Sequence, residues 1–142
     1  MTPREVFEIV VWDQWYDMPL RGIITSRSEI FAFIAKDLEQ EPPEFADHPG
    51  TYSQLKAFPC GEDLMTLFQR KSKIFREWRA RFDRGEVTTS THPLLVDAEF
   101  QRIADEINQY FNRQSSPAIE QMGLLWSESG RFFFECSGSL ST

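Results

Sequence analysis

Apolar side chains follow two spacings along this chain, which divide it into strand-like and helix-like segments. Six short runs rich in β-branched and aromatic residues predict strands, because such side chains pack well on a pleated surface. These runs are residues 6–12, 22–25, 29–36, 51–58, 119–126 and 131–136. Two longer segments, residues 62–84 and 96–113, repeat apolar side chains at helical spacing and predict amphipathic helices.

The order of these segments predicts the fold class. Strands, then helices, then strands indicate an α+β protein with a mainly antiparallel sheet of about five or six strands and two helices packed on one face. In the second helix, Val96 begins the apolar stripe and Asp97 is the predicted cap. With 142 residues and no repeat or low-complexity tract, residues 1–142 are expected to form a single domain.

Composition and charge narrow the function classes. The chain is 41% hydrophobic and contains 13 phenylalanines, enough for a core without disulfides or metals. Its formal net charge of −7 argues against binding to nucleic acids or anionic membranes. Cys60 and Cys136 lack metal-ligand spacing and are expected to be reduced thiols. Without an apolar signal core or a run of membrane-spanning length, the protein is expected to be soluble and cytoplasmic.

The stretch from Val10 to Gly22 concentrates residue types that are used in recognition. Its proline and glycine predict a loop of defined shape after the first strand. The candidate binding residues in it are Asp13, Trp15, Tyr16, Asp17 and Arg21. The two aspartates could form a carboxylate pair for acid–base chemistry, with Arg21 as an anion clamp. The alternative is structural, with the polar residues fixing the loop and the aromatic residues covering a sheet edge.

The first predicted helix adds a basic face, because seven of the chain's 15 basic residues lie between Arg70 and Arg84. This face could bind an acidic partner or a phosphate, or it could be a solvated surface salt-bridged to acidic neighbours. Lys71 falls within the apolar stripe of the same helix, which makes it a further candidate binding residue. A lysine there either extends its ammonium group to the edge of the stripe or is buried with a partner.

Metal and cofactor chemistry has little support in the sequence. His48 and His92 each precede a proline and have no other ligand at metal-binding spacing. The chain has no glycine-rich phosphate loop and no nucleophile elbow. We therefore expect no metal, no cofactor and no assigned catalytic residue, and the sequence favours a protein that is not an enzyme.

The run from Trp12 to Gly22 resembles a family of small bacterial proteins that carry the motif W-Y-D-x-P-x-x-G before an aromatic-rich strand. The similarity continues through an arginine- and tryptophan-rich helix segment around Trp78 to His92-Pro93, and covers roughly residues 10–100. Met18 stands where the pattern often has glycine. The resemblance implies a bacterial origin, and it carries over no activity or catalytic residue.

The expected function is a non-enzymatic, partner-binding domain, similar to immunity proteins or inhibitors, that uses the Asp13–Arg21 loop. Aromatic residues and arginine are typical of binding hot spots. The alternative is a small-molecule-binding protein or enzyme, in which Asp13, Asp17 and Lys71 converge on a pocket between the sheet and the long helix. A scaffold or self-associating subunit is a third class, and the sequence leaves the oligomeric state open.

Overall fold

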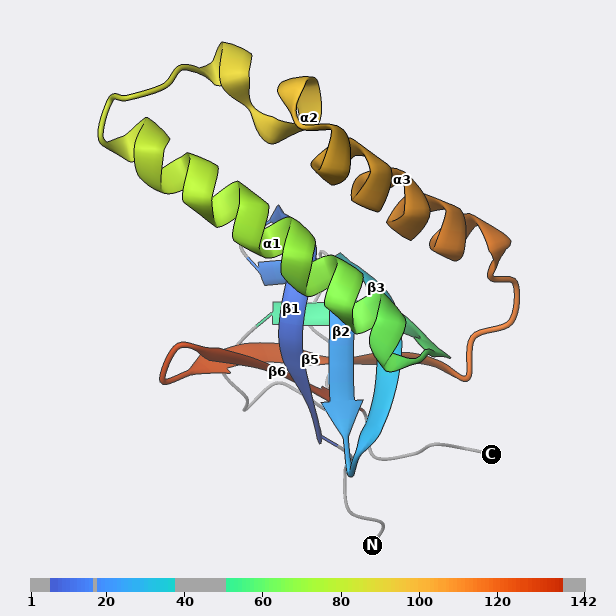
Figure 1. Ribbon diagram of the computed structural model, residues 1–142. Helices are drawn as coiled ribbons and strands as arrows, with labels where there is room; N and C mark the ends of the chain where they lie inside the picture. Colours follow the sequence, from blue (N-terminus) through green and yellow to red (C-terminus); the bar gives the residue numbers. More distant parts are fainter. Residues whose placement is uncertain (1–5, 17, 38–50, 137–142) are drawn as a thin grey trace, which may run out of the picture. The chain divides into compact units, whose positions relative to one another are not determined.

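The computed structural model describes residues 6–16, 18–37 and 51–136 (Figure 1). The chain divides into two compact units. Residues 1–61 and 116–142 make up one, which we call the barrel unit, and residues 62–115 make up the other, the helical unit. The helical unit is therefore an insertion between two parts of the barrel unit.

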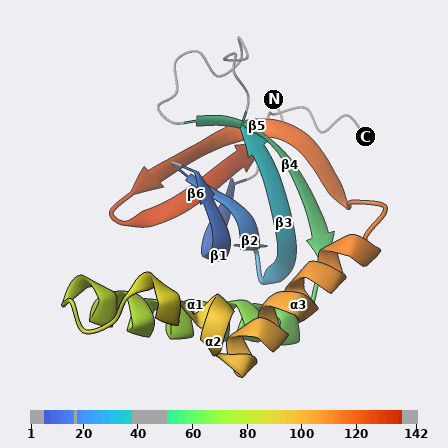
Figure 2. The same cartoon turned by 90° about the horizontal axis from the view of Figure 1, so that it is seen from above.

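Six antiparallel strands form the barrel unit, which confirms the predicted α+β class and strand number. Their bounds are β1 Val6–Tyr16, β2 Met18–Ser26, β3 Glu29–Asp37, β4 Thr51–Pro59, β5 Ile119–Glu128 and β6 Arg131–Cys136. Each strand pairs with the next, and β6 also pairs with β1, so the sheet closes into a barrel (Figure 2). The sequence predicted an antiparallel sheet without predicting its closure, and the closure is what the structure adds.

The barrel interior is filled by side chains that alternate along the strands, as expected for a small barrel. Phenylalanine dominates this core, and Phe7 and Phe31 meet edge to face with ring centroids 6.0 Å apart. The buried cluster consists of Phe7, Ile9, Ile24, Phe31, Phe33, Ala35, Leu55, Ala57, Leu125 and Phe134. Burying these aromatic and branched side chains stabilises the barrel. It also fixes the register of the strands, because a shift by one residue would turn the apolar side chains outward.

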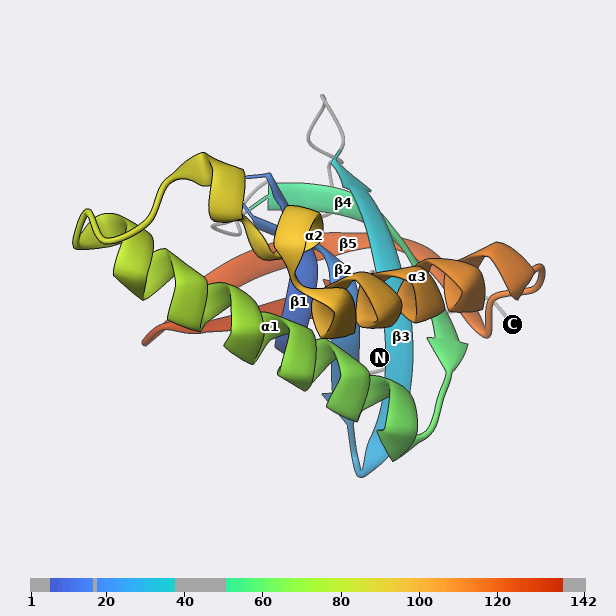
Figure 3. The same cartoon turned by 45° about the horizontal axis from the view of Figure 1, so that its top comes forward.

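The helical unit contains α1 (Glu62–Asp83), the 3-10 helix η2 (Thr89–Thr91), α2 (Pro93–Val96) and α3 (Ala98–Arg113). Helices α1 and α3 run side by side, and Phe68 of α1 meets Phe111 of α3 edge to face (Figure 3). Helix α1 ends at Asp83, and the turn that follows contains Gly85, whose φ of +74° is left-handed and favours glycine. Both predicted helices are present, and none of the described helices is long and apolar enough to span a membrane.

The second predicted helix begins two residues later than its apolar pattern suggested. Asp97 is its N-cap, as predicted, and its carboxylate accepts a hydrogen bond from the Phe100 amide at 2.9 Å. A residue before the cap lies outside the helix, so Val96 belongs to the separate turn α2 and is exposed. The prediction that Val96 lies on the buried stripe is therefore wrong.

The barrel's hydrogen bonding continues across the insertion point of the helical unit. Strands β4 and β5 pair directly, with Ala57 opposite Ile119, and the Ala118 amide donates to the Ala57 carbonyl at 2.9 Å. On the other side, the Cys60 amide donates to the Ile30 carbonyl at 3.1 Å. The 54 residues of the helical unit, 62–115, are therefore inserted between two strands that pair directly with each other.

Candidate functional site

The sequence predicted a loop from Asp13 to Arg21 between two strands, and this prediction is wrong for the described residues 13–16 and 18–21, which belong to two paired strands. Strand β1 extends to Tyr16 and β2 begins at Met18, with Trp15 opposite Pro19 and Tyr16 opposite Met18. Pro19 fits because it is the second residue of its strand, close to the hairpin end. Asp13, Trp15, Tyr16 and Arg21 therefore lie on the paired strands of the barrel wall.

Asp13 and Arg21 form a two-pronged ion pair across this hairpin. The Arg21 Nε donates to Asp13 Oδ1 at 2.8 Å, and Nη2 donates to Oδ2 at 2.5 Å. The Asp13 side chain is only 4% exposed and the Arg21 side chain only 9%. The register of β1 shifts between Trp12 and Gln14, which leaves Asp13 without a directly opposite residue. Such a bulge re-aims a side chain, and here it turns the carboxylate toward the guanidinium group.

Gly22 permits the close approach of β1 and β2 beside this ion pair. It lies opposite Trp12, and a Cβ on it would come within 2.0 Å of the Val11 carbonyl oxygen. Trp12 itself packs against the barrel core, with its ring 5.1 Å from that of Phe132. Trp12 is thus partly buried, with part of its ring system engaged in packing against the core.

These contacts limit what the hairpin can do chemically. Both oxygens of Asp13 accept hydrogen bonds from Arg21, so the carboxylate and the guanidinium group already satisfy each other. An arginine held in this way is not presented as an anion clamp. Asp17 and the side chains of Trp15 and Tyr16 lie outside the described parts, so the structure does not test their proposed role.

Lys71, the sixth candidate residue, belongs to the helical unit, whereas the other five belong to the barrel unit. Its ammonium nitrogen lies 5.5 Å from the centroid of the Phe100 ring, within cation–π range. The half-buried side chain thus follows the apolar stripe and places its charge over an aromatic face.

The basic face of α1 is partly neutralised. Arg70 donates to Glu99 at 2.7 Å, and this hydrogen bond is the main cause of a lowered pKa of Glu99. Further ion pairs join Arg79 with Asp83, Arg81 with Glu86, and Arg84 with Glu86. Among the described residues, Lys73 and Arg76 are basic residues of α1 that form no ion pair with a carboxylate.

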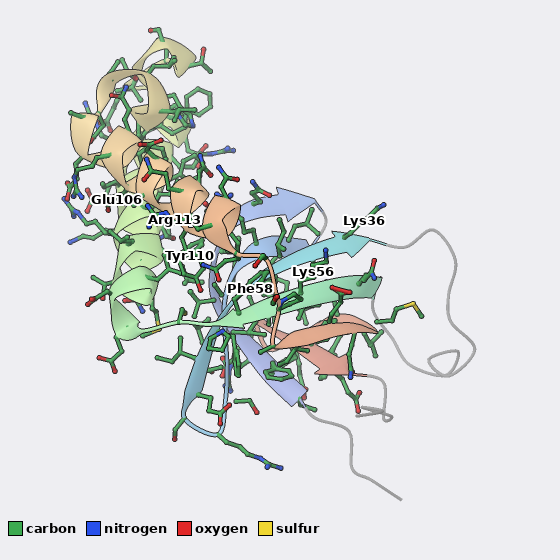
Figure 4. The ribbon with its side chains drawn as sticks, turned by 90° about the vertical axis from the view of Figure 1, so that its right-hand side faces the viewer. Lys36, Lys56, Phe58, Glu106, Tyr110 and Arg113 are labelled. Carbon is green, nitrogen blue, oxygen red and sulfur yellow. The ribbon has the colours of Figure 1, made fainter. Side chains whose placement is uncertain are left out.

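Basic residues are sparser on the barrel unit. Lys36 and Lys56 extend from the neighbouring strands β3 and β4 (Figure 4), and Lys56 lies 3.9 Å from Glu120.

The helical unit contains nine acidic and nine basic residues, so the whole excess of seven negative charges falls on the remainder of the chain. Within the helical unit, residues 70–84 carry seven basic and two acidic side chains.

Sequence reasoning missed an exposed apolar surface on α2. Leu94, Leu95 and Val96, which we call the α2 patch, are 53%, 63% and 61% exposed. Exposed apolar side chains that gather on a surface are one mark of an interaction site. The available signal was the cap at Asp97, because apolar residues that precede an N-cap cannot join the buried stripe of the helix that follows.

An aromatic cluster supports the α2 patch from within the helical unit. The His92 ring lies 4.8 Å from Trp78 and 5.7 Å from Phe75, measured between centroids. His92 Nδ1 accepts a hydrogen bond from the Leu94 amide at 3.0 Å, and Pro93 is buried. His92 therefore serves as a cap and a packing residue in the described structure.

Other chemistry-bearing groups do not assemble into a site within the described ranges. These ranges contain no group of three or more histidine, cysteine, aspartate or glutamate residues that could hold a metal ion. Burial raises the pKa of the Cys60 thiol to about 11, which disfavours the reactive thiolate. His48 lies outside the described residues.

Comparisons with protein-family models, with curated proteins and with solved structures find no match. The resemblance to the bacterial W-Y-D-x-P-x-x-G proteins therefore stays a prediction.

Proposed function

We propose that the protein is a non-enzymatic domain that binds another protein. The observation that carries this proposal is the α2 patch, three consecutive apolar side chains that are each more than half exposed. Exposing them to water is unfavourable by about 25 cal/mol for each Å², so a partner that covers them gains that free energy. The same proposal includes two more specific points, that the protein acts like an immunity protein or inhibitor and that it is of bacterial origin.

The β1–β2 hairpin end, with Trp15 and Tyr16, is a second surface in this proposal. Its support is the aromatic composition alone. Arg21 is a poor probe of this surface, because it is buried against Asp13 and its replacement would test folding rather than binding. A small-molecule site built from Asp13, Asp17 and Lys71 gains no support from the geometry of the described residues.

The test is affinity capture and cross-linking from the native host with three variants. Leu95→Ser alters the α2 patch, Trp15→Ala alters the hairpin end, and Ile34→Ser is the matched control, since Ile34 is 38% exposed on the barrel. The proposal expects a partner that the control retains and that Leu95→Ser loses. Loss with Trp15→Ala alone would move the interface to the hairpin. If all three variants retained the partner, the proposal that the α2 patch or the hairpin end binds it would be refuted.

A further inference from the structure

The His92 ring is held among side chains from three elements of the helical unit. Its centroid lies 4.8 Å from that of Trp78 and 5.7 Å from that of Phe75, both in α1, and 6.2 Å from that of Phe100 in α3. The Trp78 indole N–H also donates at 3.2 Å to the hydroxyl of Thr91, the last residue of η2. These contacts hold the ring where the turn α2 begins.

The hydrogen bond between His92 and the Leu94 amide shows which ring nitrogen carries the proton. A backbone N–H can only donate, so the Nδ1 atom that lies 3.0 Å from it presents a lone pair. In the neutral ring the proton is therefore on Nε2. The positively charged ring has an N–H at both nitrogens, and two donors would then face each other. Proton uptake by His92 is thus incompatible with the hydrogen bond that caps α2.

The loss of this hydrogen bond affects a short element. The turn α2 spans only Pro93–Val96, and its backbone hydrogen bonds run from the Leu95 amide to the His92 carbonyl at 2.8 Å and from the Asp97 amide to the Pro93 carbonyl at 2.9 Å. A single helical turn is marginal on its own and depends on its cap and its packing. Removing one net hydrogen bond should therefore increase the opening of α2 about fivefold.

Charged side chains also lie on the elements around the His92 ring. These are Arg70, Lys71 and Arg79 on α1, and Asp97 and Glu99 at the start of α3. Arg70 pairs with Glu99, and this hydrogen bond lowers the pKa of the Glu99 carboxyl, further from the range in which histidine titrates. The Lys71 ammonium lies 5.5 Å from the centroid of the Phe100 ring. The side chains of η2 are uncharged, and only histidine side chains ordinarily change charge between about pH 5 and 8.

We propose that His92 is a pH-sensitive cap, which holds the α2 turn when the ring is neutral and releases it when the ring takes up a proton. The faces of Trp78 and Phe75 attract a cation, so the charged ring stays in the aromatic cluster and the backbone of α2 moves. The α2 patch is then ordered at neutral pH and loosened toward pH 5. The proposal concerns the protein alone, and it holds with or without a partner on the patch.

Amide hydrogen exchange followed by NMR tests this proposal on the full-length protein between about pH 7.5 and 5. The reporter is the Asp97 amide, because its bond to the Pro93 carbonyl breaks when α2 opens. Its protection, corrected for the intrinsic exchange rate at each pH, is expected to fall about fivefold. His92→Asn retains a capping side chain that does not titrate, so its protection should stay constant. The control His48→Asn removes the other histidine of the chain and should keep the wild-type fall.

The wild-type protein provides a second measurement, which decides the question even if His92→Asn does not fold. Long-range proton–nitrogen NMR spectra distinguish the two neutral forms of the ring from the charged form. At about pH 8, His92 is expected to carry its proton on Nε2, and its titration should share one midpoint pH with the Asp97 protection. A proton on Nδ1 at that pH, different midpoints, or a fall in protection that persists in His92→Asn would overturn the proposal.

Discussion

Replacing one member of the Asp13–Arg21 pair is expected to destabilise the protein strongly. Removing one partner of a buried ion pair leaves an uncompensated charge and typically costs about 3–5 kcal/mol, whereas an apolar pair of similar volume is often neutral. With side chains 4% and 9% exposed and two hydrogen bonds between them, the pair meets the conditions for this asymmetry. We expect Asp13→Leu and Arg21→Met each to cost about 3–5 kcal/mol, and the double variant to cost less than either.

Urea denaturation followed by circular dichroism measures these free energies. For a chain of this length, about 3–5 kcal/mol corresponds to a fall in Tm of roughly 10–15 °C. The control is the pair Arg79 and Asp83, one helical turn apart with side chains 57% and 59% exposed, where Arg79→Met and Asp83→Leu should each cost about 0.5 kcal/mol. If the Asp13 and Arg21 variants cost no more than this control, or if their costs simply add, the reasoning is refuted.

Three other variants or conditions test separate features. Gly22→Ala should lower the free energy of unfolding by about 2 kcal/mol or more, because its Cβ would lie 2.0 Å from a backbone oxygen, whereas Gly61→Ala, with open space around it, should change little in urea denaturation. The hydrogen bond from Arg131 lowers the pKa of Glu8 from its ordinary 4.5, so the stabilisation that it provides is present above that value and is lost as the pH falls through the folded-state pKa. Glu8→Gln should therefore flatten the decline of the urea midpoint at acidic pH, and an unaltered decline would contradict the pairing. Because the pKa of Cys60 is raised from 9.0 to about 11, its alkylation by iodoacetamide at pH 8 should be roughly 100-fold slower than that of an ordinary thiol, as measured by peptide mass spectrometry. A rate equal to that of free cysteine would show that the thiol is not buried.

The strands and the long helix were predictable because their apolar spacing is local. Closure of the barrel was not, since the alternation of side chains is the same in an open and in a closed sheet. Closure depends on pairing between β1 and β6, for example Phe7 with Phe134, which are far apart in the sequence. The local spacing of apolar residues does not predict pairing between strands that are so far apart in the sequence.

The wrong prediction of a loop from Asp13 to Arg21 has a different cause. Proline and glycine usually interrupt strands, and both occur here. In the structure, Pro19 lies near the hairpin end, and Gly22 is required by the approach of the neighbouring backbone. The pairing of Asp13 with Arg21 depends on a bulge, which shifts the face on which a side chain lies without a clear trace in the sequence.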